Sequence, residues 1–243
     1  TEIGGKIVYI GGIAKGSGMI HPNMATMLCF ITTDAAISAD MLKIAVKTVA
    51  DKSFNMVSVD GDTSTNDTLA VMASGLAENA EITEQNEDYN IFVEALTILC
   101  RKLSKEMAKD GEGASKLLVC KVSGAKTEKD AKGVAKSVVC SSLLKAAMFG
   151  SDANWGRVLC AIGYSGCDVD INKVDVSFAS KAGKVDVCKN GAGIDFSEEI
   201  AKTVLTEDEI DIVVELNDGN GVAEAYGCDL TYEYVKINGD YRS

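Results

Sequence analysis

The chain of 243 residues contains one histidine, one proline and one tryptophan, and these scarcities limit its chemistry. With a single histidine and eight cysteines that form no C-x-x-C pair, a metal site is not expected. No apolar run approaches the roughly 20 residues of a membrane helix, and no charged-then-apolar signal opens the chain. The 24 Lys and Arg residues are outnumbered by 36 Asp and Glu, which argues against nucleic acid as a partner. We therefore expect a cytoplasmic protein that contacts neither membrane nor nucleic acid.

Hydrophobic spacing predicts a mixed α+β fold. Helices are expected at 41–51 after a Ser38 cap, 68–77, 87–109, 128–148, 153–164 and 197–204. Strands are expected at 5–10, 26–32, 56–60, 117–122, 174–178, 184–188, 210–216 and 222–228. The glycine-rich stretch 217–221 predicts a hairpin between the last two strands. Asn66 or Asp67 is expected to cap the helix at 68–77.

The stretch 11–34 holds the only histidine and the only proline, and four of its first eight residues are glycine. Such a composition suits a backbone bent tightly around one peptide bond. Thr26 follows the small residue Ala25, so its hydroxyl is able to attack the preceding carbonyl and, after hydrolysis of the ester, to become N-terminal. A free α-amine titrates near pH 7.7 to 8.0 and is able to deprotonate that hydroxyl. The simpler interpretation is that Thr26 only begins a β-strand.

The acidic loop 60–67 offers a second candidate site. Asp60 and Asp62 alternate as in a calcium loop, but Thr65 and Val71 stand where such a loop needs Gly and Glu. A phosphate-transferring site that uses the two aspartates with magnesium is an alternative. Turn chemistry explains the same residues more simply.

Five segments together resemble the ornithine acetyltransferases, which are glutamate N-acetyltransferases of the self-processing N-terminal-threonine type. They are KGSGMIHPNMATMLCFITTDA at 15–35, SVDGDTSTNDT at 58–68, DGEGASK at 110–116, FGSDANWGR at 149–157 and the closing residues 234–243. The segments occur in order over essentially the whole chain. This resemblance implies a layered α/β sandwich of the ornithine acetyltransferase/DmpA-like type with a smaller C-terminal α/β lobe.

The resemblance also assigns roles to individual residues. It implies cleavage between Ala25 and Thr26, with Thr26 as the nucleophile. It implies that the substrate is contacted by Lys15, Thr26, Glu112, Asn238 and Ser243. Without the resemblance, Lys15 is an ordinary surface lysine and Glu112 a solvated loop acid.

The activity implied is transfer of acetyl from N2-acetylornithine to glutamate through an acetyl-threonine ester, in arginine biosynthesis. The resemblance implies no resident cofactor, allows acetyl-CoA as a second acetyl donor, and implies an α2β2 assembly. It divides the chain into the end of an α segment (1–25), a nucleophile-bearing domain (26–160) and a smaller C-terminal lobe (161–243). The family's oxyanion-stabilising Thr-Gly pair belongs to an upstream α segment that this chain lacks, and losing one such donor typically costs about 100- to 1000-fold in rate.

Two other functions fit the same residues. In an aminopeptidase or amidohydrolase with the same nucleophile, water would hydrolyse the acyl-enzyme in place of glutamate. A non-catalytic subunit would form no acetylated threonine.

Overall fold

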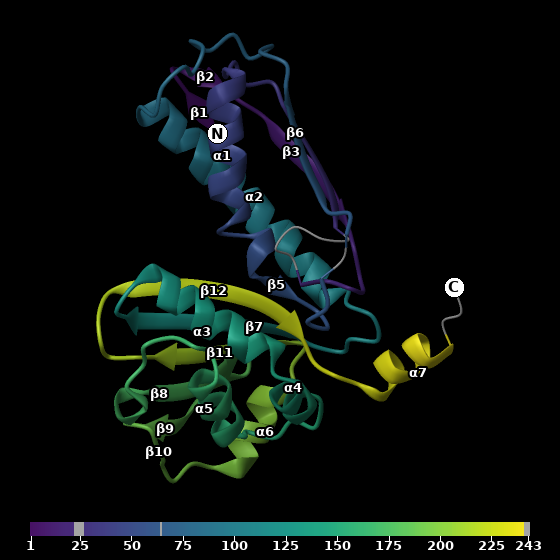
Figure 1. Ribbon diagram of the computed structural model, residues 1–243, viewed down its shortest axis with the longest axis vertical. Coiled ribbons are helices and arrows are strands. Elements are labelled where there is room, and N and C mark those ends of the chain that lie inside the picture. Colours follow the sequence, from purple (N-terminus) through teal and green to yellow (C-terminus); the bar gives the residue numbers. More distant parts are fainter. Residues whose placement is uncertain (22–26, 64, 241–243) are drawn as a thin grey trace.

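A computed structural model describes residues 1–21, 27–63 and 65–240. Its N-terminal part is a three-stranded sheet, hereafter the outer sheet, in which β3 (Ile10–Lys15) runs antiparallel to β4 (Leu28–Thr33) and β4 runs parallel to β6 (Thr68–Ala73). Helices α1 (Ala39–Ala50) and α2 (Glu87–Lys109) cover one face of this sheet (Figure 1). A small ladder of β1 (Glu2–Ile3) and β2 (Lys6–Ile7) lies at its far end.

The two helices begin where polar side chains cap them. The side chain of Ser38 accepts a hydrogen bond from the N–H of Met41, and that of Asn86 accepts one from the N–H of Tyr89 at 3.0 Å. Helix α2 has the predicted bounds and buries Phe92 and Leu96 against the outer sheet and its neighbours. The pattern of capping and helical spacing was therefore sufficient for this helix.

The second part of the chain is built on a mixed seven-stranded sheet. Its strand order is β10 (Ala192–Gly193), β9 (Gly183–Lys189), β8 (Asp175–Ser180), β11 (Glu209–Glu215), β7 (Leu117–Ala125), β12 (Gly221–Cys228) and β5 (Val57–Ser58). One face carries α3 (Glu128–Cys140), α4 (Ser142–Phe149), α5 (Trp155–Gly163) and α6 (Glu198–Leu205). Short 3-10 helices occupy Phe54–Met56 and Ile171–Lys173, and α7 (Tyr232–Asp240) extends away from the body (Figure 1).

Strand β7 separates two hydrophobic cores. Leu118 and Cys120 face the core formed with α3 to α6. Leu117 and Val119 face the core formed with α1, α2 and the outer sheet. Because successive side chains of a strand point to opposite faces, one strand serves both cores.

The segment predicted as a helix at 68–77 is a strand, so that prediction was wrong. Residues 68–73 form β6, which pairs with β4 from Leu28↔Thr68 to Thr33↔Ala73. Asp67 does not cap a helix; its Oδ1 accepts a hydrogen bond from the N–H of Met27. Pairing with a strand 40 residues earlier decides this segment, and local sequence carries no sign of that partner.

The predicted hairpin of the last two strands is also wrong. β11 pairs in parallel with β7, and β12 pairs antiparallel with the other edge of β7. The glycine-rich turn therefore joins two strands that flank a third. The expected helix 128–148 is broken at Ser141, whose extended backbone ends α3 and whose side chain caps α4.

The expected strand at 5–10 is divided in the structure: β2 occupies Lys6–Ile7, and a second strand, β3, begins at Ile10. Strand β3 runs from Ile10 through both glycines to Lys15, because every residue in it pairs with β4. The division of the chain at residues 25 and 160 stays a prediction, and the seven-stranded sheet contains strands from both sides of residue 160. Within the described residues, none of the helices combines the length and the apolar character needed to cross a membrane.

Candidate active site

Glu112 lies in the turn between α2 and β7 and contacts the glycine-rich loop that follows β3. Its backbone N–H donates to the carbonyl of Ser17 at 2.8 Å. Its carboxylate packs on Gly18 so closely that a Cβ on that glycine would lie 2.4 Å from the carboxylate carbon. Glycine at 18 therefore makes room for the acid, and the predicted site residue Glu112 lies beside the stretch that leads to Thr26.

Helix α7 brings the C-terminal tail to the same place. The side chain of Asn238 donates to Glu112 Oε2 at 3.0 Å, although the two residues are 126 positions apart. The start of α7 is held by the Thr231 hydroxyl, which donates to the carbonyl of Gly113 at 2.6 Å. Gly113 has φ +67, and a Cβ there would lie 2.5 Å from the backbone nitrogen of Tyr234. Gly18 and Gly113 thus both allow other segments to approach closely.

The carboxylate of Asp60 accepts hydrogen bonds from both the glycine-rich loop and helix α7. Its carboxylate accepts hydrogen bonds from the N–H of Met19 at 2.7 Å and of Ile20 at 3.1 Å. The Tyr234 hydroxyl donates to the same carboxylate at 3.4 Å. Burial raises the pKa of Tyr234 to about 12, and the negative charge of Asp60 adds to the shift. Tyr234 therefore stays protonated and able to donate.

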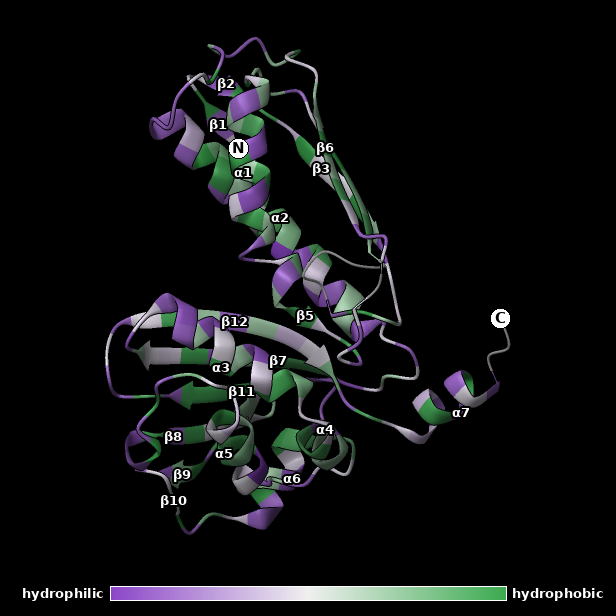
Figure 2. Cartoon of the chain, viewed as in Figure 1, coloured by the Kyte–Doolittle hydropathy of each residue, from purple (hydrophilic) through white to green (hydrophobic). Residues whose placement is uncertain are grey.

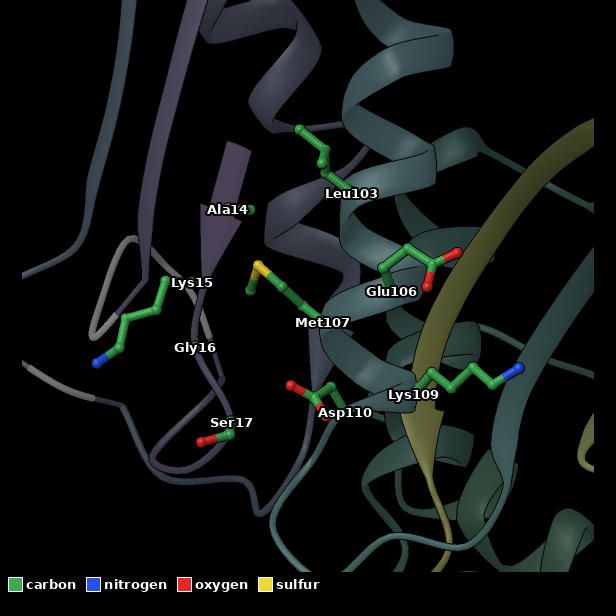
Figure 3. Close-up of a pocket in the computed structure, with 9 residues that line it drawn as sticks. All are labelled: Ala14, Lys15, Gly16, Ser17, Leu103, Glu106, Met107, Lys109 and Asp110. Carbon is green, nitrogen blue, oxygen red and sulfur yellow. The ribbon is translucent and has the colours of Figure 1, made fainter. Parts of the chain in front are cut away.

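Lys15 ends β3 at the mouth of a cavity of about 640 Å³ that Ser17, Met107 and Asp110 also line. Figure 3 shows the side chains of Met107 and Asp110 directed from α2 toward the loop, while the Lys15 side chain lies on the other side of its strand. Among the described residues, no hydrogen bond or ion pair joins Lys15 to Glu112 or Asn238. Its ammonium group is exposed and free to meet a carboxylate from solution.

The only histidine precedes the predicted cleavage segment and is half-buried. His21 Nδ1 lies 3.0 Å from Ser58 Oγ and 3.5 Å from Cys140 Sγ. Burial lowers the pKa of His21, and the nearby charge of Lys136 acts in the same direction. The imidazole is thus neutral near pH 7 and links the loop to β5 and α3.

Two buried lysines bind backbone carbonyls that come from distant segments, and sequence analysis singled out neither. Lys145 Nζ donates to the carbonyls of Val59 at 2.7 Å and Cys228 at 2.6 Å. Lys116 Nζ donates to the carbonyls of Met148 at 2.6 Å and Leu205 at 2.7 Å, and burial lowers its pKa. A lone lysine inside the apolar run 143–148 was the signal available for Lys145.

The structure thus brings two of the predicted site residues, Glu112 and Asn238, into direct contact and places Lys15 on the adjoining strand end. Ala25, Thr26 and Ser243 lie outside the described residues. In the part of the chain that is described, no group of three or more His, Cys, Asp or Glu side chains is arranged to hold a metal ion.

Chemically, the site presents two carboxylates beside one glycine-rich loop. Asp60 is occupied by backbone N–H groups, whereas Glu112 has a single described partner for its carboxylate, a neutral amide. A carboxylate held in this way suits the ammonium group of a small ligand. The exposed Lys15 suits an anionic group, so this end of the molecule offers a partner for each of the two charges of an amino acid.

Comparison with known proteins agrees with these motifs. The model of the ArgJ family matches residues 1–243. The chain is 56% identical over 238 residues to the arginine biosynthesis bifunctional protein ArgJ 1 of Clostridium acetobutylicum, covering 98% of this chain and 58% of that protein. It is 52% identical over 241 residues to the arginine biosynthesis bifunctional protein ArgJ of Bacillus subtilis, covering 99% and 58%.

A solved structure also matches the fold. The crystal structure of the arginine biosynthesis bifunctional protein argJ from Bacillus halodurans superposes with a TM-score of 0.82 at 46% sequence identity, covering 86% of this chain and 97% of that one. The mixed α+β architecture expected from the sequence is therefore confirmed. The chain spans only 58% of the length of the two curated relatives named above.

Proposed function

The chain belongs to the ArgJ family, and on that premise we propose that it is the nucleophile-bearing part of an enzyme that transfers acetyl from N2-acetylornithine to glutamate in arginine biosynthesis. The observation that carries the proposal is the contact network of Glu112. Its backbone holds the loop that leads to Thr26, and its carboxylate meets the tail at Asn238. Three motifs far apart in sequence thereby meet at one place.

We assign the site residues as follows. Thr26, released by cleavage of the Ala25–Thr26 bond, is the nucleophile. Glu112 and Asn238 bind the amine end of the substrate, and Lys15 binds its carboxylate. Ser243, at the end of the tail that carries Asn238, is a further substrate contact.

The reaction proceeds in two balanced steps. The Thr26 hydroxyl attacks the acetyl carbonyl, its proton passes to the α-amine of Thr26, and the amide bond to ornithine breaks as that proton moves to the leaving amine. The amine of glutamate then attacks the ester, and the hydroxyl of Thr26 regains a proton. No resident cofactor is needed, and acetyl-CoA is the second donor to test, since the relatives are named bifunctional.

The upstream segment of the longer relatives is the proposed partner of the outer sheet. The face of that sheet away from α2 exposes Ile13 (72%), Phe30 (41%) and Met72 (53%), and Ile13 is paired directly with Phe30. Figure 2 shows hydrophobic colour along part of β6. An apolar sheet face of this kind is normally covered.

We further propose that segment 1–25 is the end of the upstream α segment, that 26–160 and 161–243 are the nucleophile-bearing domain and the smaller lobe, and that two α and two β segments assemble as α2β2 in the cytoplasm. The same upstream segment would supply the oxyanion-stabilising donors. The chain alone is then expected to be poorly active.

The test is expression of the full-length protein with its native upstream sequence, followed by intact mass measurement and an assay with acetyl-labelled N2-acetylornithine. We expect a fragment beginning at Thr26, acetylation on Thr26, and label in N-acetylglutamate. Thr26→Ala should be uncut and inactive.

Other results would favour the alternatives. Label released as acetate, with or without glutamate, would indicate an amidohydrolase. Absence of acetylated Thr26 in a cut protein would indicate a non-catalytic subunit. Activity abolished by a chelator would favour magnesium-dependent chemistry at Asp60 and Asp62.

A further inference from the structure

The acidic loop that follows β5 has no part in the reaction proposed above, yet its first residue holds the glycine-rich loop. Asp60 Oδ2 accepts the N–H of Met19 at 2.7 Å, and Asp60 Oδ1 accepts the N–H of Ile20 at 3.1 Å. The N–H of Val59 donates to the carbonyl of Ile20 at 2.7 Å. Two consecutive residues after β5 therefore fix three backbone groups of the loop that follows β3.

A second aspartate holds the segment that carries Glu112 in a similar way. Strand β12 runs parallel to β5, and Asp229 and Asp60 each lie two residues beyond the last paired position of their strands. Asp229 Oδ1 accepts the N–H groups of Ser115 at 2.8 Å and Lys116 at 3.0 Å. The two strand ends thus hold the two segments that meet at Glu112.

Buried Lys145 joins these two strand ends. Its Nζ donates to the carbonyls of Val59 and Cys228, the residues immediately before the two aspartates. Hydrogen bonds from a charged donor are among the stronger ones in a protein interior. One ammonium group therefore sets the separation of the strand ends, and the aspartates transmit that separation to the glycine-rich loop and to the segment that carries Glu112.

Asp60 also contacts helix α7, which borders the Glu112 carboxylate on another side. The Tyr234 hydroxyl donates to Asp60 Oδ2 at 3.4 Å. Asn238 lies one helical turn later, on the same face of α7, and donates to Glu112 Oε2 at 3.0 Å. Each residue of α7, all of them described, keeps part of its surface exposed, so the helix depends on such side-chain contacts for its position.

We propose that Asp60 is a positioning residue for an ammonium subsite at Glu112, because it holds both the loop and the helix that border this carboxylate. The inference rests on the proposed function, in which Glu112 and Asn238 bind the amine end of the substrate. An ammonium group has three donors, and each needs an acceptor within about 3 Å. A shift of about 1 Å in either segment would therefore weaken binding of the amine.

The charge of Asp60 must be separated from its hydrogen bonds, because a negative charge attracts an ammonium group even without holding any segment. Asp62 is the matched control. It belongs to the same loop, and its negative charge, like that of Asp60, raises the pKa of Tyr234. Among the described residues, however, nothing donates a hydrogen bond to its carboxylate. Asp62→Asn thus removes a charge alone, whereas Asp60→Asn removes a charge and leaves one acceptor oxygen for two N–H groups.

The experiment compares two acetyl donors, N2-acetylornithine and N2-acetylnorvaline, which lacks only the side-chain amine. Acetyl transfer to glutamate is measured with the full-length protein and its native upstream sequence. For Asp60→Asn we expect kcat/KM for N2-acetylornithine to fall by about 100-fold, mainly through KM, and kcat/KM for N2-acetylnorvaline to change by less than about 3-fold. Asp62→Asn should stay within about 2-fold of the wild type with both donors.

Tyr234→Phe is the second variant, because it keeps every charge and removes only the bond between Asp60 and α7. We expect kcat/KM for N2-acetylornithine to fall by about 5-fold and that for N2-acetylnorvaline to stay unchanged. This variant decides the question if Asp60→Asn does not fold or is not cleaved. Wild-type preference between the two donors in Tyr234→Phe would then overturn the inference.

Two other results would overturn it. One is an equal loss with both donors in Asp60→Asn, which would make Asp60 part of the framework only. The other is the same selective loss in Asp62→Asn as in Asp60→Asn, which would show that charge matters and position does not. Failure of the proposed function would look different, because the wild type itself would then transfer acetyl from neither donor to glutamate.

Discussion

The two sheets of this molecule differ in how their faces are covered. In the seven-stranded sheet, β7 is buried on both sides, with Leu117 and Val119 facing one core and Leu118 and Cys120 the other. In the outer sheet, β4 buries Ile31 completely, whereas its neighbour Phe30 is 41% exposed on the opposite face. Strand β7 is thus covered on both faces within this chain, whereas the outer sheet presents an apolar face that needs a partner. Lys15, a proposed substrate contact, is the last residue of β3 in the outer sheet.

Truncation of one large side chain in each sheet should give the largest contrast. Leu118→Ala should lower the free energy of unfolding by about 4 kcal/mol, because it leaves a cavity between β7 and its helices. Phe30→Ala in the same chain should cost less than about 1 kcal/mol. Chemical denaturation of the two variants measures both values.

The same pair tests the proposed cover of the outer sheet. When the upstream segment is present, the cost of Phe30→Ala should rise to about 3 kcal/mol, because the ring would then be buried. An unchanged cost in the full-length protein would mean that the segment does not lie on this face.

Elements that depend on interactions between nearby residues could be predicted from the sequence, whereas elements that depend on pairing with distant segments could not. Helix α2 was predicted with its bounds, since capping by Asn86 and the spacing of Phe92 and Leu96 are local. Strand β6 was predicted as a helix, because its apolar run alternates poorly and its partner β4 lies 40 residues earlier. The false hairpin had the same origin, since β7 enters between β11 and β12 from far upstream.

The site shows the same limit. Glu112 and Asn238 came from motif resemblance, and no spacing rule predicted that they touch. Asp67 was interpreted as a helix cap, because a polar residue before an apolar run is typical of one. Only the pairing of two parallel strands placed it against Met27.

The buried lysine between the two parts should have the next largest effect. Lys145→Met should cost about 3 kcal/mol in unfolding free energy, because the carbonyls of Val59 and Cys228 would lose a charged donor in a buried setting. Lys129→Met on the exposed side of α3 is the control and should stay within about 0.5 kcal/mol. Equal costs would show that Lys145 does not tie the two cores together.

The pH dependence of stability probes the covered face of β4. Burial raises the pKa of the Cys29 thiol from 9.0 to about 11. A raised thiol pKa favours the protonated form in the folded state, so this stabilisation is present below pH 9 and is lost as pH rises toward 11. Between pH 9 and 11, the free energy of unfolding of Cys29→Ala should fall less steeply with pH than that of the wild type. The difference in slope should correspond to the release of up to about one proton. Val49→Ala, a change at another buried position of the same core, should lower stability without changing the slope.

The smallest contrast is expected at the helix ends, where the two parts of the molecule should behave alike. Asn86 caps α2 beside the outer sheet, and Thr127 caps α3 on the seven-stranded sheet, where its hydroxyl accepts the N–H of Asp130 at 3.1 Å. Each cap satisfies one N–H of its own helix, so Asn86→Ala and Thr127→Ala should each cost about 1 kcal/mol in unfolding free energy. A cost at Asn86 several times that at Thr127 would mean that the cap of α2 also holds the outer sheet in place. Similar costs at the two caps would mean that the two parts differ in stability only at the faces of their sheets. There, the cost of a substitution depends on whether another segment covers the face.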